Sequence, residues 1–73
     1  MTDTRNALAQ FYYHAKNIKD AVDVQDVEEI QIAIHEDNEI DNTASEMLLD
    51  LCNDRLKQFN YMEQAKKLYG EAV

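Results

Sequence analysis

The chain has 73 residues and a formal net charge of −8, from fifteen acidic and seven basic residues. This length allows one small domain, and the acidity argues against direct binding to nucleic acid or to an anionic membrane, because both attract basic surfaces. One glycine and no proline disfavour a sheet-rich fold with many tight turns, and a single cysteine excludes an internal disulfide.

No part of the sequence resembles an export signal or a membrane span. The N-terminus lacks the basic, apolar and small-residue series of a signal peptide. No apolar run approaches the roughly 18 residues that a spanning helix requires. We therefore expect a cytoplasmic protein.

The first predicted element is a helix over residues 4–22. Its apolar side chains recur at intervals of three and four, the spacing of one helical face; they are Leu8, Phe11, Tyr12, Ala15, Ile18 and Val22. The residues suited to cap its first turn are Thr2, Asp3 and Thr4. Because Phe11, Tyr12 and Tyr13 are consecutive, they cannot all face one core. We expect Tyr13 to point outward or into a second subunit.

A second helix is predicted over residues 24–36. Asp23 is suited to cap its first turn, where Asp26 and Glu28 would meet the positive end of the helix dipole. The apolar residues on one side of this helix are Val24, Val27, Ile30 and Ile34. Residues 29–34 also alternate as a strand would, but the chain offers no second strand for pairing.

Thr43 and Glu46 predict the start of a further helix. After a polar connection over residues 35–42, they match a capping box, in which the two side chains bind backbone amides of the first turn. The helix is predicted over residues 44–58. Its inward face would consist of Met47, Leu48, Leu51, Cys52 and Phe59.

A second start signal, at Asn60, predicts a short fourth helix over residues 60–69. Alternatively, one helix continues from residue 44 to residue 69, since nothing at Asn60 forces a break. Gly70 suits the left-handed conformation that ends a helix.

These patterns together predict an all-α fold, a single domain over residues 1–73 consisting of a bundle of three or four helices. The apolar stripes of the first and third helices should meet, with the second helix across them. The expected core comprises Leu8, Phe11, Tyr12, Ile18, the valines and isoleucines of residues 22–34, Met47, Leu48, Leu51, Leu56, Phe59, Met62 and Leu68.

The acidic charge is concentrated in the middle of the chain. Residues 20–54 hold twelve of the fifteen acidic residues and neither lysine nor arginine. Glu46, Asp50 and Asp54 recur every four residues, so on a helix they form one row with about 5–6 Å between neighbours. Such a row resembles the regular charges of a phosphate backbone, and we expect it to bind a basic, nucleic-acid-reading surface of another protein. The carboxylates expected around it are Asp26, Glu29, Glu36, Asp37, Glu39 and Asp41.

This charge pattern also has a simpler interpretation. Acidic residues early in a helix stabilise its dipole, and charged outer faces keep small proteins soluble. That interpretation accounts for Asp26, Glu28 and Glu46. It accounts neither for Asp50 and Asp54 nor for the absence of lysine and arginine from residues 20–54. We therefore favour a functional acidic surface over a solvated face.

The histidines and the cysteine do not form a recognisable site. His14, His35 and Cys52 lack the spacing of zinc ligands. We expect His14 to be a partly buried packing residue and His35 to lie near a helix end. Cys52 has the spacing of a core residue, where a thiol acts as a small apolar group.

Residues 37–48 begin like a calcium-binding loop, with acids at alternate positions. Asn42 stands where the loop needs glycine, and Leu48 stands where it needs a bidentate acid. The sequence also lacks a phosphate-binding glycine loop and a nucleophile elbow. We therefore expect no enzyme, no cofactor and no metal.

Two short runs are similar to segments of the Hha/YmoA family, small helical modulators that join nucleoid-structuring proteins. They are Glu39-Ile40-Asp41-Asn42 and Asp54-Arg55-Leu56, within about a quarter of the chain. The rest of that family is much more basic, so no residue role is carried over. In size and charge the chain also resembles small acidic inhibitors encoded by bacteriophages, which would place it in the host cytoplasm.

The preferred function is a non-enzymatic, protein-binding inhibitor or regulator that occupies a basic surface of its partner. One alternative is a structural accessory subunit held by apolar helix faces, and another is an acidic co-regulator of a basic nucleoid-associated protein. Aromatic residues are enriched at interfaces, so Tyr13 and Tyr61 predict a homodimer.

Overall fold

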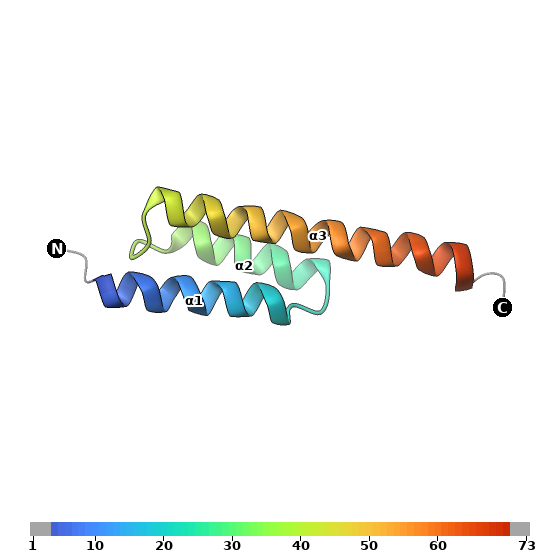
Figure 1. Ribbon diagram of the computed structural model, residues 1–73, viewed down its shortest axis with the longest axis horizontal. Coiled ribbons are helices and arrows are strands. Elements are labelled where there is room, and N and C mark those ends of the chain that lie inside the picture. The colour runs from blue at the N-terminus through green and yellow to red at the C-terminus, as the bar shows by residue number, and fades with distance from the viewer. Residues whose placement is uncertain (1–3, 71–73) are drawn as a thin grey trace.

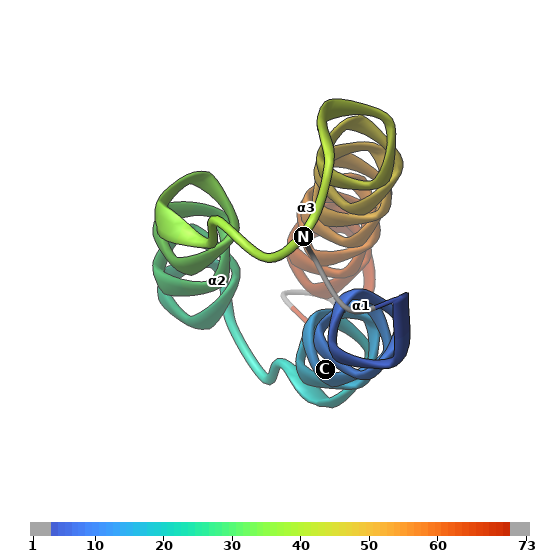
Figure 2. The ribbon, with the colours of Figure 1, turned by 90° about the vertical axis from the view of Figure 1, so that its left-hand side faces the viewer.

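The computed structural model describes residues 4–70, which form three α-helices: α1 (Thr4–Asp20), α2 (Val24–Glu36) and α3 (Asn42–Gly70). Consecutive helices run in opposite directions (Figure 1). Viewed along its length, the bundle has one helix at each corner of a triangle (Figure 2). The predicted all-α bundle is confirmed, and the described segment 29–34 is helical, not a strand.

The connection between α1 and α2 is held by its own polar groups. α1 ends at Asp20, two residues before the predicted end. Asp23 caps α2 as predicted, because its Oδ1 accepts the Asp26 amide at 2.9 Å. In return, the Asp26 carboxylate accepts the Val22 amide at 3.1 Å. The Asp23 carboxylate thus satisfies an amide of the first turn of α2, and the Asp26 carboxylate satisfies an amide of the connection before it.

The start of α3 differs from the prediction. Asp41, not Thr43, provides the cap: its Oδ1 accepts the Ala44 amide at 2.8 Å, and its backbone carbonyl accepts the Ser45 amide at 2.9 Å. The helix consequently begins at Asn42. The predicted capping box at Thr43 is wrong because an equally suitable acceptor occurs two residues earlier.

α3 is one continuous helix of 29 residues, so the predicted break at Asn60 is wrong and the alternative of a single helix is confirmed. Gly70 is still helical and does not adopt positive φ, which makes the predicted left-handed end wrong as well. At 1.5 Å per residue α3 is about 43 Å long, against about 25 Å for α1. Residues 60–70 therefore extend beyond the α1–α2 connection (Figure 1) and are called the overhang below.

The core is a narrow strip where the three helices meet. The side chains most deeply buried in it are Val27, Ile34, Leu48 and Cys52, joined by Ile18, Ala21, Ile40 and Phe59. Several predicted core residues are exposed instead; they are Leu8, Tyr12, Val22, Val24, Ile32, Met47, Leu51, Met62 and Leu68. Three helices bury less of each helical face than the apolar pattern suggests, and the overhang buries almost none.

Arg55 links α3 to the end of α1. The guanidinium Nη2 donates to the Ala21 carbonyl at 2.8 Å, and Nη1 donates to Gln58 Oε1 at 2.8 Å. The guanidinium also lies 4.7 Å from the centroid of the Phe59 ring. A cation at the carbonyl end of a helix is favoured by the helix dipole.

We expect Arg55→Met to lower the free energy of unfolding by about 1.5–3 kcal/mol, the usual contribution of a hydrogen bond to a charged group. Urea unfolding followed by circular dichroism measures this change. Lys57→Met removes an equal charge from an exposed position of the same helix and should change stability by less than about 0.5 kcal/mol. Equal effects of the two substitutions would show that the contact with Ala21 contributes nothing specific.

Candidate functional site

The predicted acidic row lies on the outer face of α3. Glu46, Asp50 and Asp54 are all exposed and occupy successive turns of the helix. Within residues 4–70 none of the three carboxylates takes part in a hydrogen bond or an ion pair with a side chain. The row is therefore available to bind cationic groups of another molecule.

Basic residues lie beside one end of this row. Asp54 lines a shallow groove between α1 and α3 together with Lys19 and Arg55. Glu46 and Asp50 have neither lysine nor arginine within four residues along the chain, so the sequence around them favours a negative potential.

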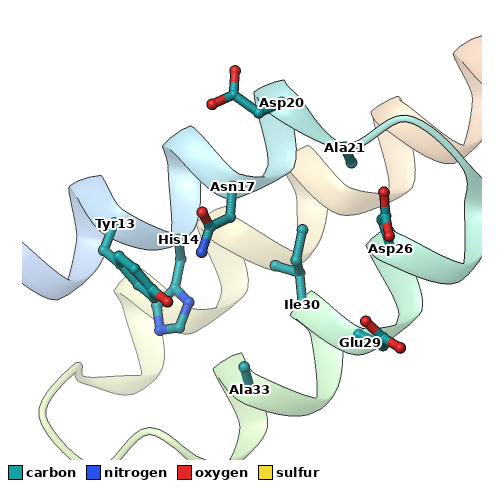
Figure 3. Close-up of a pocket in the computed structure, with 9 residues that line it drawn as sticks. All are labelled: Tyr13, His14, Asn17, Asp20, Ala21, Asp26, Glu29, Ile30 and Ala33. Carbon is teal, nitrogen blue, oxygen red and sulfur yellow. The ribbon is translucent and has the colours of Figure 1, made fainter.

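A second acidic region is the groove between α1 and α2, with a volume of about 340 Å³ (Figure 3). Ile30 points from α2 toward α1, and Asp26 and Glu29 lie on the same helix beside it (Figure 3). Asp20 stands at the rim on α1, with its carboxylate directed away from α2 (Figure 3). The groove is lined by Tyr13, His14, Asn17, Asp20, Ala21, Asp26, Glu29, Ile30 and Ala33.

This acidic groove has the chemistry needed to receive a lysine or arginine side chain. Apolar atoms of Ile30 and Tyr13 can contact the aliphatic part of such a side chain, while the carboxylates of Asp26 and Glu29 supply negative charge for its cationic end. The sequence predicted Asp26 and Glu29 but missed Asp20, which joins the lining from α1 because of how α1 and α2 pack together. No local pattern reveals that packing.

Asp37 has a structural partner. Its Oδ2 lies 2.7 Å from Nε2 of His14, which is only 3% exposed. The Asp37 Oδ1 accepts the Glu39 amide at 2.9 Å. Burial raises the pKa of Asp37, but the hydrogen bonds from Glu39 and His14 and the charge of His14 outweigh it, so the pKa lies below its ordinary value of 3.8. His14 was expected to be a partly buried packing residue; it is instead buried and paired with Asp37, and it joins α1 to the α2–α3 connection.

We expect Asp37→Ala to lower the free energy of unfolding by about 1–3 kcal/mol at pH 7, because it leaves the buried His14 ring without this partner. Glu36→Ala, at the exposed neighbouring position, is the control. A carboxylate with a lowered pKa stabilises the fold only while it is ionised. The difference between parent and Asp37→Ala should therefore persist above pH 4 and decline as the pH falls below 3.8. A difference that grows on acidification would contradict this assignment.

The other predicted contact residues divide into two groups. Asp26 and Asp41 bind backbone amides at helix starts, which uses part of their hydrogen-bonding capacity. Glu29, Glu36 and Glu39 are exposed. The acidic row together with Glu29, Glu36 and Glu39 therefore remains as the principal acidic surface.

The two tyrosines predicted for an oligomer interface lie on different parts of the molecule. Tyr13 is exposed, as expected, on α1, where its ring contacts His14 edge to face with a centroid distance of 5.5 Å. Tyr61 is exposed on the overhang. The structure does not bring the two residues onto one surface.

Cys52 is fully buried, as predicted, and burial raises the pKa of its thiol. Residues 4–70 contain no cluster of three or more His, Cys, Asp or Glu side chains arranged to hold a metal ion. Among the three described helices, none has the length and apolar character needed to cross a membrane.

No family model, curated protein or solved structure matches this chain.

Proposed function

We propose that the protein is a non-enzymatic inhibitor or regulator that binds a basic, nucleic-acid-reading surface of a partner protein. The observation that carries the proposal is the acidic row of Glu46, Asp50 and Asp54, exposed and without side-chain partners in the described residues. Carboxylates left unpaired on one face are available for lysine and arginine side chains.

The mechanism is competition for the cationic surface of the partner. Neighbouring carboxylates in the row are separated by about 6 Å along the helix, given a rise of 1.5 Å per residue. Because the row lies within one continuous helix, the helical backbone sets the spacing of these charges before binding, which lowers the entropic cost of association. Complementary charge accelerates encounter with the partner and excludes the phosphates that would otherwise bind there.

The acidic groove supports the same proposal. A partner lysine or arginine that enters it would contact Ile30 while its charge approaches Asp26 and Glu29. Acidic surfaces on α2 and α3 would suit a partner with several basic residues. A basic nucleoid-associated protein is one such partner.

The second candidate function is a structural accessory subunit. Leu8 and Tyr12 lie one turn apart on α1, and both are more than half exposed. An apolar contact of this kind would hold the chain in a larger complex, with the carboxylates serving only solubility. Leu8→Ser combined with Tyr12→Ser would abolish such binding and leave charge-dependent binding intact.

Capture from a cell lysate on the immobilised protein, followed by mass spectrometry, tests the proposal. We expect basic nucleic-acid-binding proteins that are displaced by added double-stranded DNA and by several hundred millimolar salt, since the Debye length then falls to a few ångströms. Capture that resists both treatments and depends on Leu8 and Tyr12 would favour the accessory subunit instead.

A further inference from the structure

The overhang carries an apolar stripe that the bundle leaves largely exposed. Tyr61, Met62, Leu68 and Tyr69 are each more than half exposed, and Ala65 is also exposed. Their spacing of three, four and seven residues places all five on one side of the helix. These five residues are called the apolar stripe. They form the largest set of exposed apolar side chains on a single helical face of α3.

The overhang meets the bundle along one side only: Met62, Glu63 and Lys66 line a groove with Val22, Asp23 and Val24 of the α1–α2 connection. Every residue from 60 to 70 is nevertheless exposed. Most of the stability of helices in proteins comes from packing of an apolar face against another element. A partner on the apolar stripe would supply that packing.

The order of residues in the stripe favours a second copy of the same chain. Residues equally distant from Ala65 have similar side chains: Met62 matches Leu68, and Tyr61 matches Tyr69. In an antiparallel pair of helices centred on Ala65, Met62 of one copy lies opposite Leu68 of the other copy, and Tyr61 lies opposite Tyr69. The small side chain at the centre allows the two helix backbones to approach closely.

We propose that the protein forms an antiparallel homodimer in which the apolar stripes of two overhangs pack against each other across Ala65. The two acidic bundles then lie at opposite ends of the dimer and present two copies of the acidic row. The proposal rests on α3 alone and is independent of the proposed function. A pair of short helices is a small interface, so we expect a dissociation constant in the micromolar range.

Disulfide formation tests the orientation. Cys52 is fully buried and does not compete. Ala65→Cys should form a covalent dimer under mild oxidation, because the two copies of residue 65 face each other. A mixture of Tyr61→Cys and Tyr69→Cys should cross-link to a mixed dimer, whereas each variant alone should remain largely unlinked. Cross-linking of each variant alone without mixed dimers would indicate a parallel pair and overturn the proposal.

Sedimentation equilibrium at tens of micromolar tests whether the stripe is required. The parent should sediment as a dimer of the 8.5 kDa chain and Leu68→Glu as a monomer. Ile32→Glu introduces the same charge at an exposed apolar position of α2 and should remain dimeric. Circular dichroism verifies that both variants are folded. A monomeric parent, or equal dissociation of both variants, would refute the proposal and leave the stripe to a different protein.

Discussion

Leu48→Ala should unfold most of the protein at 25 °C. Leu48 is fully buried at the meeting point of the three helices, and truncation of a buried leucine to alanine costs about 2–5 kcal/mol. A single core in a chain of this length rarely supplies more than about 3–5 kcal/mol. The expected result is a loss of most helical circular dichroism, or a urea midpoint near zero.

The adjacent residue provides a matched control. Met47 is 54% exposed although its sequence pattern predicted a core position. Met47→Ala should leave the free energy of unfolding within about 0.5 kcal/mol of the parent. A loss of stability comparable to that of Leu48→Ala would mean that α3 is rotated relative to the orientation described here.

Neutralising the acidic row should have the largest effect on partner binding. We expect Glu46→Gln, Asp50→Asn and Asp54→Asn together to weaken binding to the captured partner by several kcal/mol. Removing one member of a desolvated charge pair costs about 2–5 kcal/mol, and less at the rim of an interface. Isothermal titration with the purified partner measures the change.

The same triple variant should be as stable as the parent or more stable. Like charges four residues apart on a helix destabilise it by about 0.2–0.5 kcal/mol per pair, and the substitutions remove two such pairs. Thermal unfolding by circular dichroism should therefore give an equal or higher Tm. A lower Tm together with loss of binding would indicate that the substitutions weaken binding by destabilising the fold and not by removing contacts with the partner.

The local features of the fold were predictable because they depend on neighbours in the sequence. The Asp23 cap and the bounds of α2 follow from residues within one helical turn. The start of α3 was mispredicted because Asp41 and Thr43 are both suitable caps, and local sequence does not decide between them. The continuity of α3 through Asn60 was correctly recognised as an open alternative.

The features that were missed depend on contacts between distant residues. The pairing of His14 with Asp37 spans 23 positions, and nothing near Asp37 indicates it. The exposure of Met47 and Met62 follows from the triangular packing and from the length of α3, which helical periodicity alone does not specify. The acidic row was predictable because its spacing and charge are both properties of one helix.

The most direct test of the acidic surface compares two charge-matched variants at two salt concentrations. Asp50→Asn with Asp54→Asn alters the row, whereas Glu28→Gln with Glu63→Gln removes two charges outside it. With the captured partner at low salt, the row variant should bind at least tenfold more weakly than the parent, and the control should bind within about twofold. At several hundred millimolar salt the difference between row variant and parent should shrink. Equal weakening by both variants, or no weakening by either, would contradict the assignment of binding to Glu46, Asp50 and Asp54.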